Sequence, residues 1–188
     1  MIQLTFSFLS TVKSITKQLT VWLLLFCTLV SLNSCGIYSL NGANIQPNIK
    51  TISINNFYNE AAGGPPNMSQ SLTEKLKEYY QRNSTLKISN VEGDLQLQGA
   101  IVSYTLSPIA IAAQQPGQVD QAALNRLTIR VKAKFENTKD DSQNFDTDFS
   151  FYQDFPQSQN LTDVEGRIVP VILDQIVLDI FNKSVANW

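Results

Sequence analysis

Two runs of alternating apolar and polar residues, joined by the polar turn Thr138–Gln143, constrain the fold of this chain more than any other feature. In Leu124–Asn137 and in Asn144–Phe155 the large aliphatic and phenylalanine residues, apart from Leu124 itself, keep to positions of one parity. A strand with one buried and one solvated face has this period of two. We therefore predict an antiparallel hairpin whose apolar face belongs to the core and is formed by Leu127, Ile129, Val131, Ala133, Phe135, Phe145, Phe149, Phe151 and Phe155.

The other face of the first run carries a stripe of basic residues, Arg126, Arg130, Lys132 and Lys134. Arginine and lysine are the usual partners of phosphate groups in proteins. One interpretation of the stripe is therefore a contact with an anion, such as the phosphates of a lipid headgroup or of a glycolipid. The four residues are the candidate anion-contact site of this sequence.

A second interpretation of the basic stripe requires no ligand. If the hairpin is centred near Asp140, three basic residues face acidic ones across the strands: Lys134 and Asp146, Lys132 and Asp148, Arg126 and Asp154. Opposite charges paired across two strands stabilise a sheet by about 0.2–1 kcal/mol each. On this interpretation only Arg130, which faces Ser150, lacks an acidic partner. Both interpretations remain open.

The rest of the chain gives a coarse order of elements. We predict strands over Lys50–Phe57, Leu86–Ser89 and Leu95–Leu106, a helix over Met68–Asn83, and a long connection over Ser107–Ala123. A last helix is expected to begin at the capping box Thr162-Asp163-Val164-Glu165 and to be kinked or split at Pro170. A bulge is expected at Gly99-Ala100. This order predicts an α+β two-layer sandwich, with two helices on one face of a mostly antiparallel four-stranded sheet.

The N-terminal segment has the pattern of a bacterial lipoprotein signal. Lys13 and Lys17 precede the apolar run Leu19–Leu32, which ends in Leu32-Asn33-Ser34-Cys35. A basic region, a short apolar region and small residues before a cleavage site are typical of secretory signals. We expect residues 1–34 to be removed, Cys35 to carry acyl chains such as palmitate, residues 35–49 to form a tether and residues 50–188 to form one domain. The alternatives are an uncleaved anchor and an ordinary signal peptide.

Composition narrows the possible functions. The sequence has no histidine, and removal of the signal leaves Cys35 as the only cysteine, in acylated form. Without a free thiol or an imidazole, Cys/His nucleophiles and Cys/His metal sites are excluded. The net charge of −2, which becomes −4 once Lys13 and Lys17 are removed, argues against a nucleic-acid partner. We therefore predict a protein that is not an enzyme and has no cofactor, no metal site and no nucleic-acid partner.

The chain resembles the LptE family of lipopolysaccharide-assembly lipoproteins, in the form found in Bacteroidetes. The resemblance rests on a set of segments in order: Cys35–Gly42, Thr51–Ile54, Ala123–Ile129, Asn137–Asp141, Asp179–Lys183 and Asn187-Trp188. It implies a non-enzymatic lipoprotein of the outer membrane that faces the periplasm and is anchored there by its lipid. It also implies that the chain plugs the β-barrel LptD, assists assembly of that barrel and takes part in lipopolysaccharide transport to the cell surface.

Two other functional classes are alternatives to the one that the resemblance implies. The first is an auxiliary lipoprotein of an ABC-type envelope transport system, which would have inner-membrane partners. The second is a hydrolase that uses carboxylates such as Asp146 and Asp148. The sequence disfavours the hydrolase, because these residues are predicted on an open sheet face opposite lysines, where no pocket excludes water.

Overall fold

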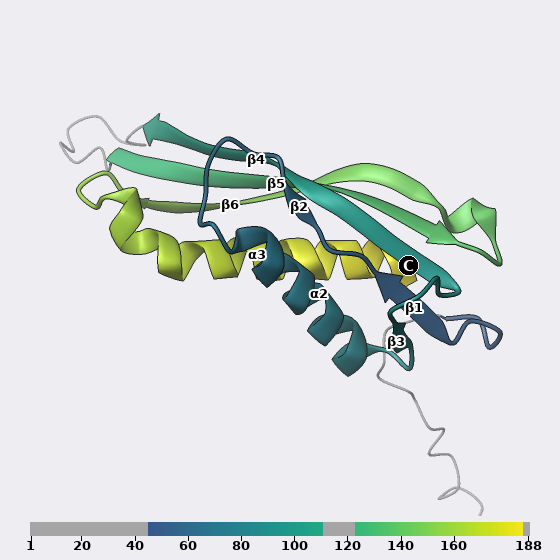
Figure 1. The fold of residues 1–188 in the computed structure, drawn as a ribbon. Helices are drawn as coiled ribbons and strands as arrows, with labels where there is room; N and C mark the ends of the chain where they lie inside the picture. The colour runs from purple at the N-terminus through teal and green to yellow at the C-terminus, as the bar shows by residue number, and fades with distance from the viewer. Residues whose placement is uncertain (1–44, 111–122, 186–188) are drawn as a thin grey trace, which may run out of the picture. The chain divides into compact units, whose positions relative to one another are not determined.

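The computed structural model describes residues 45–110 and 123–185. In chain order its elements are β1 (Thr51–Ile54), β2 (Tyr58–Asn59), α2 (Met68–Asn83), β3 (Lys87–Ser89), β4 (Leu95–Ala110), β5 (Ala123–Asn137), the 3-10 turn η1 (Asp141–Gln143), β6 (Phe145–Pro156) and α3 (Leu161–Val185). Both helices lie on the same side of one sheet (Figure 1). The α+β class and the placement of the helices are therefore confirmed.

The sheet itself differs from the prediction of four mostly antiparallel strands. It is mixed and six-stranded, with the order β3-β1-β4-β5-β6, and the short β2 pairs with β4. β1 is parallel to both β3 and β4, and β2 is parallel to β4. The direction of β3 follows from α2, because a helical crossover returns the chain to the end of the sheet at which the previous strand began.

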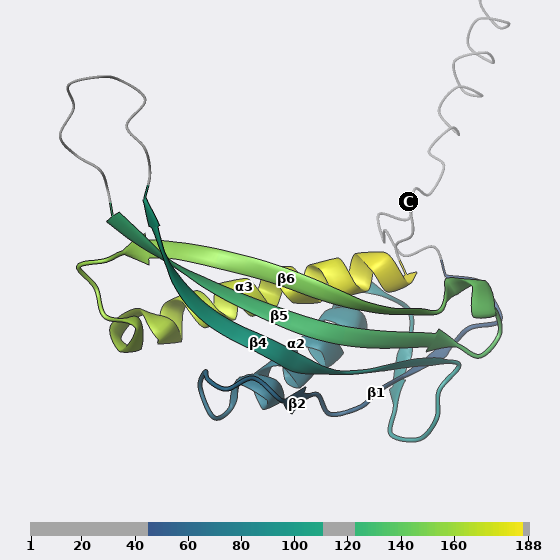
Figure 2. The ribbon, with the colours of Figure 1, turned by 90° about the horizontal axis from the view of Figure 1, so that it is seen from above.

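The strands β4, β5 and β6 are long, antiparallel and adjacent (Figure 2). The predicted hairpin register of β5 and β6 is confirmed, since Lys134 faces Asp146 and Arg126 faces Asp154. At the turn end, the rings of Phe135 and Phe145 stack with centroids 5.3 Å apart. The alternating pattern therefore identified both the faces and the register of this hairpin.

β4 changes face at Val102 rather than at Gly99-Ala100. Its pairing with β5 shifts between Ile101 and Ser103, so Val102 is the extra residue of a β-bulge. Gly99 pairs regularly with Ala133, and it is needed there because β4 lies very close to the backbone of β5. The strand also continues to Ala110, so the expected connection starts later than residue 107 and its remainder, 111–122, lies outside the described residues.

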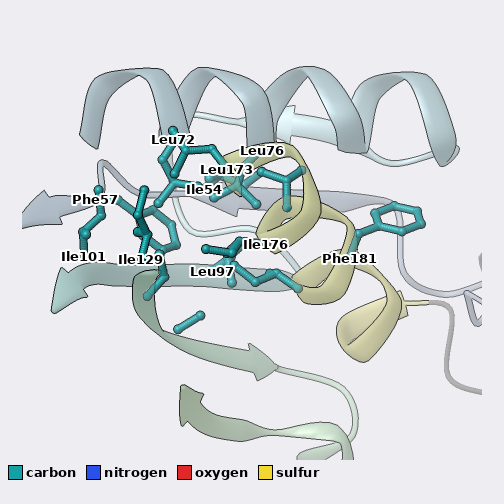
Figure 3. Close-up of a cluster of buried hydrophobic side chains, with 14 of the residues drawn as sticks. Ile54, Phe57, Leu72, Leu76, Leu97, Ile101, Ile129, Leu173, Ile176 and Phe181 are labelled. Carbon is teal, nitrogen blue, oxygen red and sulfur yellow. The ribbon is translucent and has the colours of Figure 1, made fainter. Parts of the chain in front are cut away.

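The core lies between the sheet and the two helices (Figure 3). Leu72 and Leu76 of α2 and Leu173 and Ile176 of α3 point toward the buried side chains of the sheet. The phenylalanines of β6 belong to this side, as expected: Phe155 is buried, and Phe145, Phe149 and Phe151 are partly buried against the core. Neither α2 nor α3 is long and apolar enough to cross a membrane.

The last helix starts earlier than predicted and is not split. α3 begins at Leu161 and continues through Pro170 without being split. Buried residues before and after the proline, including Ile168 and Ile172, pack on the sheet, and such packing contributes more to helix stability than local propensity does. The expected capping box is absent: Thr162 lies inside the helix rather than at its cap, and the Glu165 carboxylate instead accepts a hydrogen bond from the Tyr104 hydroxyl.

Candidate functional site

The candidate site is the side of the sheet that faces away from the helices, onto which Figure 2 looks. We call it the charged face and define it by seven outward side chains of β5 and β6: Arg126, Arg130, Lys132, Lys134, Asp146, Asp148 and Asp154. The pleat of the two strands brings all of them to one side, because alternate side chains point to opposite faces. The four candidate anion-contact residues therefore do lie together, as a stripe along β5.

The ion pairs of the charged face are not all those expected from the register. The Arg130 guanidinium lies 3.8 Å from an Asp148 oxygen, and the Lys132 ammonium lies 3.4 Å from an Asp146 oxygen. Each base thus contacts an aspartate two residues along β6 from its direct partner, which is Ser150 for Arg130 and Asp148 for Lys132. Arg130 was expected to lack an acidic partner, and this expectation is wrong: long side chains on neighbouring strands reach diagonal positions as well as direct ones.

Arg126 is the most tightly held base of the stripe. Its Nε and one Nη donate to the two carboxylate oxygens of Asp154 at 2.8 and 2.9 Å, in a bidentate pair. Its guanidinium carbon also lies 3.6 Å from the centroid of the Tyr152 ring. The hydrogen bond from Arg126 lowers the pKa of Asp154 and raises the pKa of Arg126 itself. Arg126 is therefore largely occupied by its own neighbours.

Lys134 has a partner on its own strand. Its ammonium lies 2.6 Å from a Glu136 carboxylate oxygen, and this hydrogen bond raises the pKa of Lys134. The side chains of Lys132 and Lys134 are about half exposed, at 55% and 46%. Ion pairs this exposed contribute only about 0–1 kcal/mol, so a stronger anion can displace their carboxylate partners. These two lysines, together with Arg130, whose side chain is 51% exposed, are the available cations of the charged face.

A hollow of about 410 Å³ adjoins these two lysines on the charged face. We call it the lysine hollow; its lining is Tyr58, Glu60, Gln98, Gly99, Ala100, Val102, Lys132, Lys134 and Asp146. It combines two ammonium groups with two carboxylates, an amide and an aromatic ring that is 69% exposed. Ammonium and amide groups bind phosphate and hydroxyl oxygens, and an aromatic ring covers apolar surface. The hollow is equipped to hold a polar ligand that bears anionic groups.

Tyr58 and Glu60 were missed by sequence reasoning, because they follow the predicted strand Lys50–Phe57 and lie in no predicted element. They reach the hollow because the two-residue β2 pairs in parallel with β4, with Tyr58 next to Ala100, and because the Glu60 amide donates to the Ile101 carbonyl. A pairing this short leaves no periodic signal in the sequence. Val102 was also missed, because a bulge at Gly99-Ala100, where it was expected, would have turned Val102 toward the core.

The residues that the structure describes do not form a recognisable catalytic or metal-binding site. Within 45–110 and 123–185, no three acidic or cysteine side chains are grouped so that they could hold a metal ion. The aspartates of the charged face each lie near a base, and the pKa of Asp154 is lowered rather than raised. A general acid needs a raised carboxyl pKa. Cys35, the expected lipidation site, lies outside the described residues.

Comparison with known proteins gives one family. The family model LptE, described as lipopolysaccharide-assembly, matches residues 49–184. Two solved structures are reported as similar: a minor lipoprotein from Acinetobacter baumannii is 13% identical, with a TM-score of 0.46, over 72% of this chain and 91% of that one. An uncharacterized lipoprotein B from Nitrosomonas europaea is 14% identical, with a TM-score of 0.43, over 71% and 80%. No curated protein matches the sequence.

Proposed function

The chain belongs to the LptE family of lipopolysaccharide-assembly proteins, and from this premise we propose that it is an outer-membrane lipoprotein that plugs an LptD-type β-barrel. In this role it assists assembly of the barrel and takes part in lipopolysaccharide transport to the cell surface. The family is non-enzymatic. The match over residues 49–184 carries the proposal, because it covers every described strand and helix except the last residue of α3.

In this proposal Cys35 carries the lipid anchor, and the protein faces the periplasm. A single acyl chain binds a membrane only marginally, whereas two or more hold a protein there stably. The apolar faces of α2 and α3 are buried against the sheet, so neither helix has an apolar face left over for insertion. Acylation of Cys35 therefore supplies the attachment to the membrane.

The lysine hollow is the proposed contact for lipopolysaccharide. Lipopolysaccharide presents phosphate groups on sugars, and Lys132 and Lys134 can bind such phosphates as charge-assisted hydrogen-bond donors. Tyr58 and Gln98 offer a ring and an amide for the sugar that carries them. Arg126 and Arg130 complete the candidate contact stripe, with Arg126 the weaker contributor because it is bound to Asp154.

Co-isolation of the full chain from envelopes in mild detergent tests the barrel partnership. The proposal predicts that a large outer-membrane barrel is recovered with the chain at a fixed molar ratio. When Cys35→Ala prevents anchoring, the barrel should no longer be recovered with the chain from membranes. Recovery of inner-membrane transporter subunits would instead favour an auxiliary lipoprotein of an ABC-type system. Isolation of the chain alone would contradict both roles.

Direct binding to purified lipopolysaccharide tests the hollow. The double charge reversal Lys132→Glu/Lys134→Glu is expected to weaken binding about tenfold or more, because a charged hydrogen bond contributes about 1.5–3 kcal/mol. The matched control is Lys87→Glu/Lys183→Glu, which makes the same change in net charge at exposed positions away from the hollow. Equal weakening by both pairs would assign the effect to net charge and remove the hollow from the proposal.

A further inference from the structure

The two edges of the sheet are very unlike each other. On one side the sheet ends in β3, a strand of three residues, and on the other it ends in β6, a strand of twelve. Natural proteins usually protect sheet edges from further pairing by keeping them short, by placing lysine or proline on them or by pointing a charge inward. β3 follows this rule because it is short. β6 has no lysine, no inward charge and no proline before Pro156.

The backbone groups at the free edge of β6 can be identified from the ladder. The Gln157 amide donates to the Ala123 carbonyl at 3.0 Å, so odd-numbered residues of β6 direct their amides toward β5. In an antiparallel pair the intervening residues point away from the partner. The amides and carbonyls of Asp146, Asp148, Ser150 and Tyr152 therefore face outward in the plane of the sheet. Nothing within 45–110 or 123–185 hydrogen-bonds to them.

Side chains along this edge indicate the chemistry of a segment that would fit. On the helix side, Phe145, Phe149 and Phe151 are only partly buried against the core. On the charged face, the Asp146 and Asp148 side chains are 50% and 49% exposed. An added strand would cover the rings with its own apolar residues and would face the aspartates with basic ones. β5 has this pattern and already pairs with the opposite edge of β6.

We propose that the free edge of β6 is a docking site for an extended segment of a partner protein, which adds to the sheet as a further strand with apolar residues toward the helices and basic residues toward the charged face. Main-chain hydrogen bonds then provide affinity and alternate side chains provide specificity. A second copy of this chain fits less well, because its β6 strand carries the same aspartates and no basic residue to face them. The inference does not depend on the role in lipopolysaccharide transport.

The test uses the detergent-solubilised full chain and a synthetic peptide with the sequence of residues 124–137, which has the predicted alternation. Residue-resolved amide hydrogen exchange is measured with and without peptide. In the free protein the Thr147 and Phe149 amides should be protected and those of Asp148 and Ser150 should exchange fast. With saturating peptide, exchange at Asp148 and Ser150 should slow at least tenfold. A peptide with its four basic residues replaced by glutamate should have no such effect.

Variants of one edge residue separate strand addition from contact by side chains. Ser150→Pro removes an amide that points away from β5, so the β5–β6 ladder should survive, as shown by continued protection of Thr147. It should abolish peptide-induced protection at Asp148, while Ser150→Ala should retain it. If Ser150→Pro unfolds the chain, Asp146→Lys/Asp148→Lys provides the second test and should transfer the preference to the glutamate peptide.

Three results would overturn the proposal. The first is unchanged exchange at Asp148 and Ser150 with saturating peptide. The second is equal protection by the basic and the glutamate peptides. The third is protection that appears without peptide and rises with protein concentration, which would identify a second copy as the occupant. A barrel that co-isolates normally with Ser150→Pro would leave the proposed function intact, so the two proposals can fail separately.

Discussion

Replacement of Gly99 by alanine tests the packing of the long sheet most sharply. A Cβ atom at residue 99 would lie 2.2 Å from the Lys132 carbonyl oxygen, 2.6 Å from the ring of Phe57 and 3.1 Å from the Ala133 Cα. Carbon and oxygen atoms normally approach to about 3.3 Å. β4 and β5 must therefore separate by about 1 Å at this point, since the oxygen belongs to the backbone and cannot rotate away.

The expected cost combines two effects. Overpacking of a core typically costs about 1–3 kcal/mol, and weakening one or two ladder hydrogen bonds adds about 1 kcal/mol each. We expect Gly99→Ala to lower the free energy of unfolding by about 2–5 kcal/mol, measured by denaturant titration with the slope unchanged. Gly166→Ala is the matched control, because a Cβ there meets nothing within 4 Å. It should stabilise helix α3 by about 0.5–1 kcal/mol.

A third variant identifies which contact dominates. If the ring of Phe57 caused the clash, Gly99→Ala would cost little in a Phe57→Ala background, because the ring would be gone. If the Lys132 carbonyl causes the clash, Gly99→Ala should cost nearly the same in both backgrounds. A loss below about 0.5 kcal/mol for Gly99→Ala in the native background would refute the reasoning altogether.

Three further predictions concern single contacts. Ser184→Ala should destabilise the protein by about 1–3 kcal/mol and more than Tyr80→Phe, in thermal or denaturant unfolding, because it leaves the buried Tyr80 hydroxyl without its partner. The pKa of Asp94 is lowered from 3.8 to about 2 by hydrogen bonds, first of all from the Lys50 amide and then from the Thr51 hydroxyl. The contribution of Asp94 to stability is therefore complete above pH 3.8 and is lost as the pH falls toward 2. Asp94→Asn should therefore flatten the decline in stability over that range, and an unaltered decline would exclude Asp94 as its source. Arg126→Lys should slightly lower the midpoint of thermal unfolding, since a lysine cannot form the bidentate pair with Asp154. An unchanged midpoint would show that this partly exposed pair contributes nothing to stability.

The hairpin of β5 and β6 could be predicted in detail because two independent signals agree. The period of two assigns each residue to a face, and the polar turn centred near Asp140 determines which residues face each other. The helix Met68–Asn83 was also predicted with its observed bounds, from its apolar spacing. The ion pairs were less predictable, since Arg130 and Lys132 can each reach two aspartates and only the side-chain conformations decide between them.

The parts that escaped prediction depend on contacts between distant segments. β1 has four residues and no hairpin turn, so its sequence carries no signal of parallel pairing. The capping box did not form: Thr162 lies inside α3, and Tyr104, far away in sequence, binds Glu165. Tyr58 reaches the lysine hollow only through the two-residue β2. Each of these cases depends on tertiary contacts that override a local pattern.

Arrival of lipopolysaccharide at the cell surface, measured after conditional depletion of this chain, tests the central claim most directly. The account predicts that newly made lipopolysaccharide stops appearing at the surface and accumulates behind the outer membrane. Expression of the native chain should restore its transport, whereas Cys35→Ala should not. Undiminished delivery of lipopolysaccharide to the surface in fully depleted cells would contradict the account.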